Sequence, residues 1–115
     1  MDTRSKGRGG EDRAVEHLLA NGYRIVARNY ECRDGEIDCV AEAGDGTLVF
    51  VEVKAARSDA GGDPFSWVTR PKQRTLARMA RRYLADHDIV DRACRFDVIA
   101  IVGGRIEHME NAFLA

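Results

Sequence analysis

The alternation of apolar and polar positions predicts a helix and then a strand near the start of the chain. Residues 11–20 carry apolar side chains at helical spacing: Ala14, Val15, Leu18 and Leu19. Asn21-Gly22 follows them and is typical of a helix C-cap. Residues 23–28 alternate with period two, which indicates a strand, and residues 29–35 are expected to form a polar connection. The polar, glycine-containing segment 1–10 predicts a flexible tail.

The most regular pattern in the sequence predicts a β-hairpin over residues 35–54. Residues 36–41 have strand character, and residues 47–54 are the most β-prone octamer of the chain. Between them, Gly44-Asp45-Gly46 is a strong turn signal, because glycine tolerates positive φ and aspartate bonds its own backbone. The second strand is expected to be buried on both sides, because both of its faces are apolar. These faces carry Val49, Val51 and Val53 on one side and Leu48 and Phe50 on the other.

The segment after the hairpin predicts a loop and a second helix. Residues 55–68 contain glycines and a proline, and they are expected to form a mobile loop with one hydrophobic island, Phe65 and Trp67. Residues 71–86 have helical spacing and begin shortly after Thr69. The apolar stripe of this helix comprises Leu76, Met79, Ala80, Tyr83 and Leu84.

Two strands are predicted at the end of the chain. Residues 95–102 are almost entirely apolar, and Gly103-Gly104 turns them into a short last strand at residues 105–109. A helix between two strands of one sheet implies a right-handed crossover and parallel pairing. The predicted fold is therefore α/β with the element order αβββαββ and a mixed central sheet flanked by helices. A chain of 115 residues suits a single domain, here residues 11–115.

The hairpin register predicts that two carboxylates face each other. If the three turn residues form the loop, Ala43 pairs with Thr47, Asp38 lies opposite Glu52, and Lys54 projects from the same face. Opposed residues have Cβ atoms about 4.5–5.5 Å apart, and like charges placed so are destabilising. A divalent cation in the gap removes the repulsion, and Mg²⁺ prefers carboxylate oxygens. Two acids with an adjacent lysine therefore indicate a metal-assisted hydrolytic site.

A simpler interpretation is a solvent-facing ion pair, since Glu-x-Lys is common on exposed strands. Against it, Glu52 and Lys54 end an otherwise apolar row, where charged groups are usually paired or ligated.

Composition narrows the class of protein. No run approaches the roughly 20 apolar residues that span a bilayer, so no membrane association is expected. The three cysteines are widely spaced, which indicates a reducing cytoplasm and argues against both a disulfide framework and a zinc site. A net charge of −1 is not that of a typical nucleic-acid-binding domain, although six basic residues occur between Arg70 and Arg82. A solvated helix face explains that run equally well, because Arg74, Arg78 and Arg81 point away from the apolar stripe.

Several single polar residues permit two interpretations. Glu11 lies in the first turn of its helix, where the helix dipole favours an acid, but it is also placed to reach the site. Gln73 falls on the inward side of the second helix, where a structural hydrogen bond is as plausible as a ligand role. His17, His87 and His108 have no ligand spacing and are interpreted as surface or packing residues.

The ordered set of motifs resembles the PD-(D/E)XK nuclease superfamily. Asp38 is followed after thirteen residues by Glu52-Val53-Lys54, behind an acidic helix and ahead of a helix that carries Gln73. A closer resemblance, over nearly the whole chain, is to the YraN-like family of small bacterial proteins. It rests on Gly22-Tyr23, Arg28-Asn29, Gly35-Glu36-Ile37-Asp38, Phe50-Val51-Glu52-Val53-Lys54, Lys72-Gln73 and Phe96-Asp97-Val98. One departure is Ile37, which stands where the superfamily has a proline.

The resemblance implies a restriction-endonuclease-like core and assigns roles within it. Asp38, Glu52 and Glu11 would bind Mg²⁺ or Mn²⁺, Lys54 would assist the attacking water, and Gln73 would orient a ligand or phosphate. Basic residues are candidate nucleic-acid contacts, namely Arg57, Arg70 and Lys72. Archaeal Holliday-junction resolvases share the arrangement, which implies DNA as partner, branched or repair intermediates as substrate, and a homodimer.

Two alternatives to a nuclease stay open at this point. One is a non-catalytic nucleic-acid-binding or protein-docking module that keeps the site geometry, and the near-neutral net charge favours it. The other is an accessory protein whose paired acids bind no metal, since a fold does not by itself imply an activity.

Overall fold

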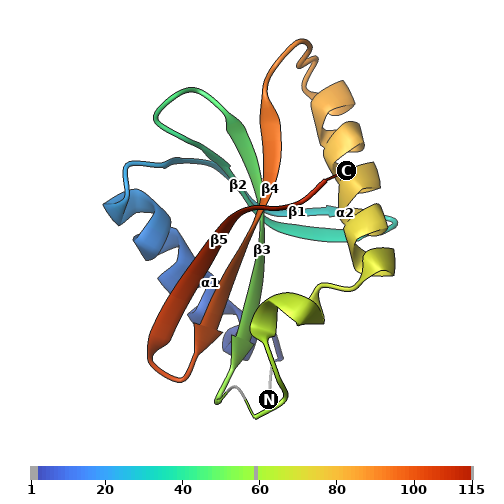
Figure 1. Cartoon of the computed structure of the whole chain (residues 1–115). Helices are drawn as coiled ribbons and strands as arrows, with labels where there is room; N and C mark the ends of the chain where they lie inside the picture. The colour runs from blue at the N-terminus through green and yellow to red at the C-terminus, as the bar shows by residue number, and fades with distance from the viewer. Residues whose placement is uncertain (1–2, 59, 115) are drawn as a thin grey trace.

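A mixed sheet lies between two long helices in the computed structural model, which describes residues 3–58 and 60–114, with side chains from residue 9 onward (Figure 1). In these ranges the elements are α1 (Thr3–Ala20), β1 (Arg24–Cys32), β2 (Gly35–Glu42), β3 (Leu48–Ala56), the 3₁₀ helix η1 (Pro64–Trp67), α2 (Arg70–Asp86), β4 (Cys94–Val102) and β5 (Arg105–Phe113). The five strands lie in sequence order, and β3 and β4 run parallel while the other neighbours are antiparallel. The predicted α/β fold and its αβββαββ order are confirmed.

The sheet is apolar on both faces, because each face packs against one helix (Figure 1). On one face, Leu48 and Phe50 of β3 pack against the buried stripe of α2. On the other face, Val49 and Val51 pack against Ala14 and Leu18 of α1. The predicted two-sided burial of β3 is therefore confirmed. Arg74, Arg78 and Arg81 of α2 are exposed, as expected for a solvated helix face.

The hairpin register is also the predicted one, and it ends beside Asp38. Cys39 pairs with Val51 and Glu42 with Leu48, and Ala43 N donates to Thr47 O at 2.9 Å. Beyond Cys39 the backbone ladder between β2 and β3 stops, whereas β2 continues to pair with β1 as far as Gly35. At the next position, Asp38 Oδ2 accepts a hydrogen bond from Val53 N at 2.8 Å. A carboxylate thus takes the place of a strand partner where the two strands separate.

The helix α1 begins at Thr3, so the prediction of a flexible tail through residue 10 is wrong for residues 3–10, and residues 1 and 2 lie outside the described chain. Glycine in this segment suggested flexibility, because it costs about 1 kcal/mol in a helix interior. Gly10 instead permits a close contact. A Cβ atom there would lie 3.2 Å from Ala55 Cβ, so the missing side chain lets α1 approach β3.

Three other boundaries differ from the predictions. The strand β1 continues to Cys32, through most of the predicted connection at 29–35. The predicted loop 55–68 contains the end of β3 and the 3₁₀ helix η1, in which Asp63 Oδ1 caps Phe65 N at 3.0 Å. Pro64 and Val68 of this segment are buried, so the segment packs against the core as well as connecting two elements. The last strand, predicted at 105–109, continues to Phe113.

Among the helices of the described residues, none combines the length and apolar character that crossing a membrane requires.

Candidate metal centre

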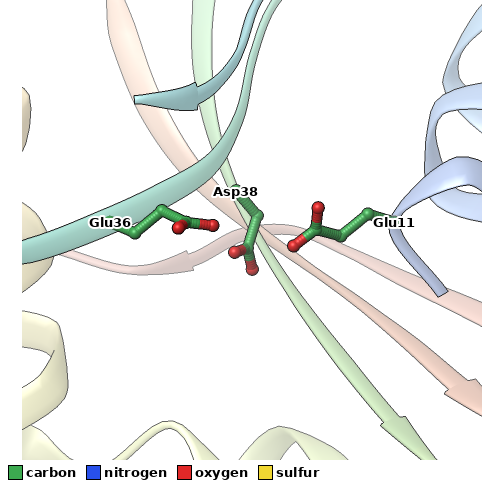
Figure 2. Close-up of side chains that lie close together, drawn as sticks. All are labelled: Glu11, Glu36 and Asp38. Carbon is green, nitrogen blue, oxygen red and sulfur yellow. The ribbon is translucent and has the colours of Figure 1, made fainter. Parts of the chain in front are cut away.

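Three carboxylates converge where β2 separates from β3. Glu11 comes from α1, while Glu36 and Asp38 are alternate residues of β2. One carboxylate oxygen of each residue lies within 4.8 Å of those of the other two. Figure 2 shows the carboxyl groups of Glu36 and Glu11 pointing toward Asp38 from two sides. The structure therefore places an acid of the first helix beside Asp38.

Glu52 joins this group from β3. It is only 4% exposed, and its side chain is hydrogen-bonded to that of Asp38. Burial, followed by the hydrogen bond with Glu52 and the charge of Glu52, raises the pKa of Asp38 to about 9, although the bond from Val53 N opposes the shift. Burial and the contact with Glu52 therefore favour the protonated form of Asp38 at neutral pH. The two acids lie together, as the register predicted.

Two lysines approach the same oxygen of Glu52. Lys54 Nζ lies 3.7 Å and Lys72 Nζ 3.4 Å from Glu52 Oε2. Lys54 comes from β3 itself, and Lys72 comes from the first turn of α2, whose N-cap is Thr69. Lys72, predicted as a nucleic-acid contact, thus lies within the site, where it neutralises the buried charge of Glu52.

Glu36 and Asn29 are site residues that the sequence reasoning did not identify. The amide of Asn29, with its nitrogen turned toward the acids, donates to Glu11 Oε2 at 2.9 Å and to Glu36 Oε1 at 3.0 Å. Burial first, then a hydrogen bond with Glu31 and the charge of Glu11, raise the pKa of Glu36. The signal for Glu36 was present, since a period of two puts it on the face of Asp38. Asn29 gave no such signal, because it lies on a different strand.

The other predicted site residues lie outside the acid cluster. Gln73 Nε2 donates to Val68 O at 3.0 Å, which is the structural hydrogen bond considered as its alternative role. Arg70 is the first residue of α2 and lines a small pocket with Gln73, while Arg57 is exposed just after β3. The structure does not bring these three side chains to Asp38, so their predicted roles stay predictions.

The donor set fits a hard divalent cation. Its ligand atoms are carboxylate oxygens, which suit Mg²⁺ and Mn²⁺ better than softer metals. Ligands of an octahedral Mg²⁺ lie about 2.9 Å apart when adjacent and about 4.2 Å apart when opposite. Oxygens within 4.8 Å of one another would share one ion after their side chains turn inward. A cation would also favour the charged form of Asp38 and so oppose the burial and the neighbouring acid that raise its pKa.

The raised pKa of Asp38 gives a test by stability against pH. An unfolded aspartate titrates near pH 4, so between about pH 4 and pH 9 the folded protein holds a proton that the unfolded chain has lost. The free energy of unfolding should therefore fall as pH rises through this window. Asp38→Asn should flatten that slope, because an amide can keep the bonds to Val53 and Glu52 without a charge. Urea unfolding between pH 5 and pH 9 measures both curves.

A divalent cation distinguishes the titration of Asp38 from the effect of pH on other groups of the protein. Adding Mg²⁺ at pH 8 should stabilise the wild-type protein and leave Asp38→Asn unchanged, because a ligand that binds only the folded state raises its stability. Identical pH slopes for the two proteins would show that Asp38 is not the group responsible.

Two of the three histidines, which the sequence led us to interpret as surface or packing residues, contact each other. His17 Nε2 lies 3.1 Å from His108 Nδ1, and His108 Nε2 lies 2.7 Å from Asp97 Oδ2. Asp97 is completely buried and also accepts hydrogen bonds from Arg95 Nε and Asn111 N. The third, His87, contacts Tyr83 O at the end of α2. Ninety-one positions separate His17 from His108, so no local spacing could reveal the pair.

The relatives of this chain carry names without an activity. A protein of Persephonella marina called "UPF0102 protein" is 45% identical over 108 residues, which cover 94% of this chain and 92% of the relative. A protein of Ralstonia nicotianae, also called a UPF0102 protein, is 52% identical over 110 residues, 93% of this chain and 85% of the relative. One from Symbiobacterium thermophilum is 48% identical over 118 residues and covers 98% of this chain and 99% of the relative.

Solved structures resemble the chain only distantly. One is the chain in "Structure of EndoMS-dsDNA2 complex", with a TM-score of 0.46 and 19% sequence identity. The matched region covers 76% of this chain and 34% of the EndoMS chain. A likeness at this level bears on neither the ligand nor the activity of this protein. The model of the family described as "Uncharacterised protein family UPF0102" matches residues 10–101. As the resemblance to YraN-like proteins predicted, the chain belongs to the uncharacterised protein family UPF0102.

Proposed function

We propose that this protein is a Mg²⁺-dependent phosphodiesterase that hydrolyses DNA, with Mn²⁺ as an alternative cation. The observation that carries the proposal is the contact between Asp38 and Glu52, with Lys54 3.7 Å from Glu52. Glu52 is buried and Asp38 half-buried, and two such acids in contact destabilise a fold unless a proton or a cation lies between them. A site that retains them, together with a neighbouring ammonium group, has the features of metal-assisted hydrolysis.

Asp38, Glu52 and Glu11 would hold the cation, and Glu36 supplies a further carboxylate within reach. A bound Mg²⁺ would polarise the scissile phosphate and offset the charge that develops on it. Asn29 positions Glu11 and Glu36 through its amide. Since the bond to Val53 N fixes Asp38 at the strand separation, the ligand set combines one rigidly held acid with others on α1, β2 and β3.

The lysines act on the water and the phosphate. Lys54 Nζ lies on the face of Glu52 and can hydrogen-bond and orient the attacking water. Lys72 Nζ neutralises Glu52 here, and with a phosphate in the site it can donate to a phosphate oxygen instead. Arg70 and Arg57 extend this positive charge along the surface toward neighbouring phosphates. Gln73 would contact a phosphate only by giving up its bond to Val68 O.

The direct test is DNA cleavage by the purified wild-type protein. Single-stranded, flapped and branched DNA are incubated with Mg²⁺ or Mn²⁺, and parallel samples contain EDTA or Ca²⁺. We expect cleavage with Mg²⁺ or Mn²⁺ and none with the chelator. Cleavage of branched substrates in preference to linear ones would support the junction-resolvase analogy, while the homodimer that it implies stays a prediction. If no substrate is cut under any condition, the proposal of an enzyme is wrong.

The second candidate is a nucleic-acid-binding or protein-docking module without catalysis. A net charge of −1 favours it, because a protein that neutralises few phosphates binds DNA weakly. Binding without cleavage, with affinity that falls steeply with salt, would support a nucleic-acid module. Association with a protein at an affinity that salt leaves unchanged would support docking.

A further inference from the structure

A polar pocket lies beside the C-terminal end of α1, whereas Glu11 of the acid cluster lies in the middle of this helix. Its volume is about 650 Å³, and it lies between the C-terminal end of α1, the β2–β3 turn, and strands β4 and β5. The side chains that line it include His17, His108, Glu110 and Asp45. Neither the proposed hydrolysis nor the packing of the sheet uses this pocket.

The geometry points to a binding site for a borderline-soft divalent cation such as Zn²⁺, with His17 and His108 as ligands. The cysteine pattern argued against a zinc site, and these ligands are imidazoles instead. We infer the site from three features: the hydrogen-bond partner of His108, the separation of the two rings, and the exposed acids around them.

His108 has the partner that a metal-binding histidine usually has. Asp97 is a buried carboxylate that can only accept hydrogen bonds, so His108 Nε2, 2.7 Å away, must donate. The other nitrogen of a neutral His108, Nδ1, is then left with a lone pair. A carboxylate that accepts from the far nitrogen of a histidine is the common support for a zinc ligand, because it fixes the tautomer and the ring orientation.

His17 brings a second imidazole nitrogen to the same point. His17 Nε2 lies 3.1 Å from His108 Nδ1, and the rings meet edge-on at 68°. Two nitrogens at Zn–N distances of about 2.0–2.1 Å in a tetrahedral site lie about 3.3 Å apart. The distance between the two nitrogens therefore suits either one shared proton or one cation, and for the cation both rings must tilt until their lone pairs meet at the ion. Binding the cation would move the proton of His17 from Nε2 to Nδ1. Asn21 Nδ2, a donor 3.5 Å from Nδ1, would then have to turn away from it.

The remaining coordination positions have oxygen donors available. Glu110 lines the same pocket, accepts from Tyr23 OH at 3.0 Å and lies 3.7 Å from Arg95 Nη2. Its side chain is 63% exposed, and it would reach the cation by leaving these two partners. Asp45 is exposed on the opposite rim. Two fixed imidazoles with a mobile carboxylate and water form an open site, from which a metal exchanges readily.

The test uses Co²⁺ as a spectroscopic substitute for Zn²⁺, together with Zn²⁺ calorimetry on the full chain. Four-coordinate Co²⁺ with nitrogen ligands absorbs strongly in the visible region, whereas Co²⁺ at a six-coordinate oxygen site absorbs weakly. The strength of the absorption therefore distinguishes Co²⁺ bound by the histidines of the pocket from Co²⁺ bound by the acid cluster. We expect the strong absorption in the wild-type protein and in Asp38→Asn. We expect its loss, with at least about tenfold weaker Zn²⁺ binding, in His17→Gln and His108→Gln.

His87→Gln is the matched control, because it makes the same substitution outside the pocket and should leave the absorption and the Zn²⁺ affinity unchanged. Thermal melts check that each variant is folded, and glutamine at position 17 can still donate to His108. The proposal is overturned if the wild-type protein gives no strong Co²⁺ absorption, or if both pocket variants retain it. Either result would mean that the two rings share only a proton.

Discussion

Asp38→Ala is expected to abolish metal-dependent DNA cleavage while leaving the protein folded. The substitution removes a carboxylate that lies within reach of Glu11, Glu36 and Glu52 at once. Loss of a metal ligand removes about 4 kcal/mol of transition-state stabilisation, or about 10³-fold in rate. Glu52→Gln should have a similar effect, and Lys54→Ala a smaller one of about 10²-fold. Initial cleavage rates at saturating Mg²⁺ measure all three.

The matched control for these variants is Asp34→Asn. Asp34 is an exposed acid in the turn between β1 and β2, close in sequence to Asp38 but outside the acid cluster. The Asp34→Asn protein should cleave DNA at the wild-type rate. Asp38→Asn separates catalysis from stability, because it should be inactive and yet at least as stable as the wild-type protein at pH 8. If the substitutions of Asp38, Glu52 and Lys54 all leave cleavage intact, the activity belongs to another site or to a contaminant.

Asp97→Ala is expected to cause the largest loss of stability. The Asp97 carboxylate is completely buried and accepts from Arg95 Nε at 3.0 Å, His108 Nε2 at 2.7 Å and Asn111 N at 2.9 Å. Removing it leaves Asn111 N without its acceptor and leaves the part-buried Arg95 guanidinium with only Tyr23 OH and Glu110 as partners. Breaking a buried charge pair in this way costs about 3–5 kcal/mol. Urea unfolding at pH 7 measures the difference, and Asp34→Asn again serves as control.

The same carboxylate should make the protein sensitive to acid. Burial alone would raise the pKa of Asp97, but hydrogen bonds from His108, Arg95 and Asn111 N outweigh burial and lower it. A lowered pKa means that the stabilisation is complete above about pH 4, the unfolded value, and is lost as pH falls through the folded value. The wild-type protein should therefore lose stability on acidification below pH 4, and Asp97→Asn should lose less. If Asp97→Ala is as stable as the wild-type protein, the hydrogen bonds to the Asp97 carboxylate contribute little to the free energy of unfolding.

Asp38 and Asp97 have a common structural role that links the site to the fold. Each accepts a backbone N–H across an interruption in a strand ladder, Asp38 from Val53 and Asp97 from Asn111. At Asp97 the partners are cations and donors, so its pKa falls. At Asp38 burial comes first and the partner is another acid, so the pKa rises. The first arrangement stabilises the fold, while the second is costly without a cation and is therefore the better candidate for a functional site.

The sequence by itself determined the element order, the two-sided burial of β3 and the hairpin register that brings Asp38 to Glu52. These features depend on local patterns: a period of two or 3.6, turn residues with positive φ, and a proline near a helix start. A two-residue periodicity fixes which side chains share a face, so a single turn was enough to place two acids together.

Only the tertiary structure decided how the acid cluster is completed and that a second polar group exists. Asn29 reaches Glu11 and Glu36 because β1, β2 and α1 meet there, and His17 reaches His108 across 91 positions of sequence. The close approach of α1 to β3 at Gly10 is likewise a tertiary contact. Such contacts come from the packing of a helix across a sheet, and no local pattern of residues encodes them.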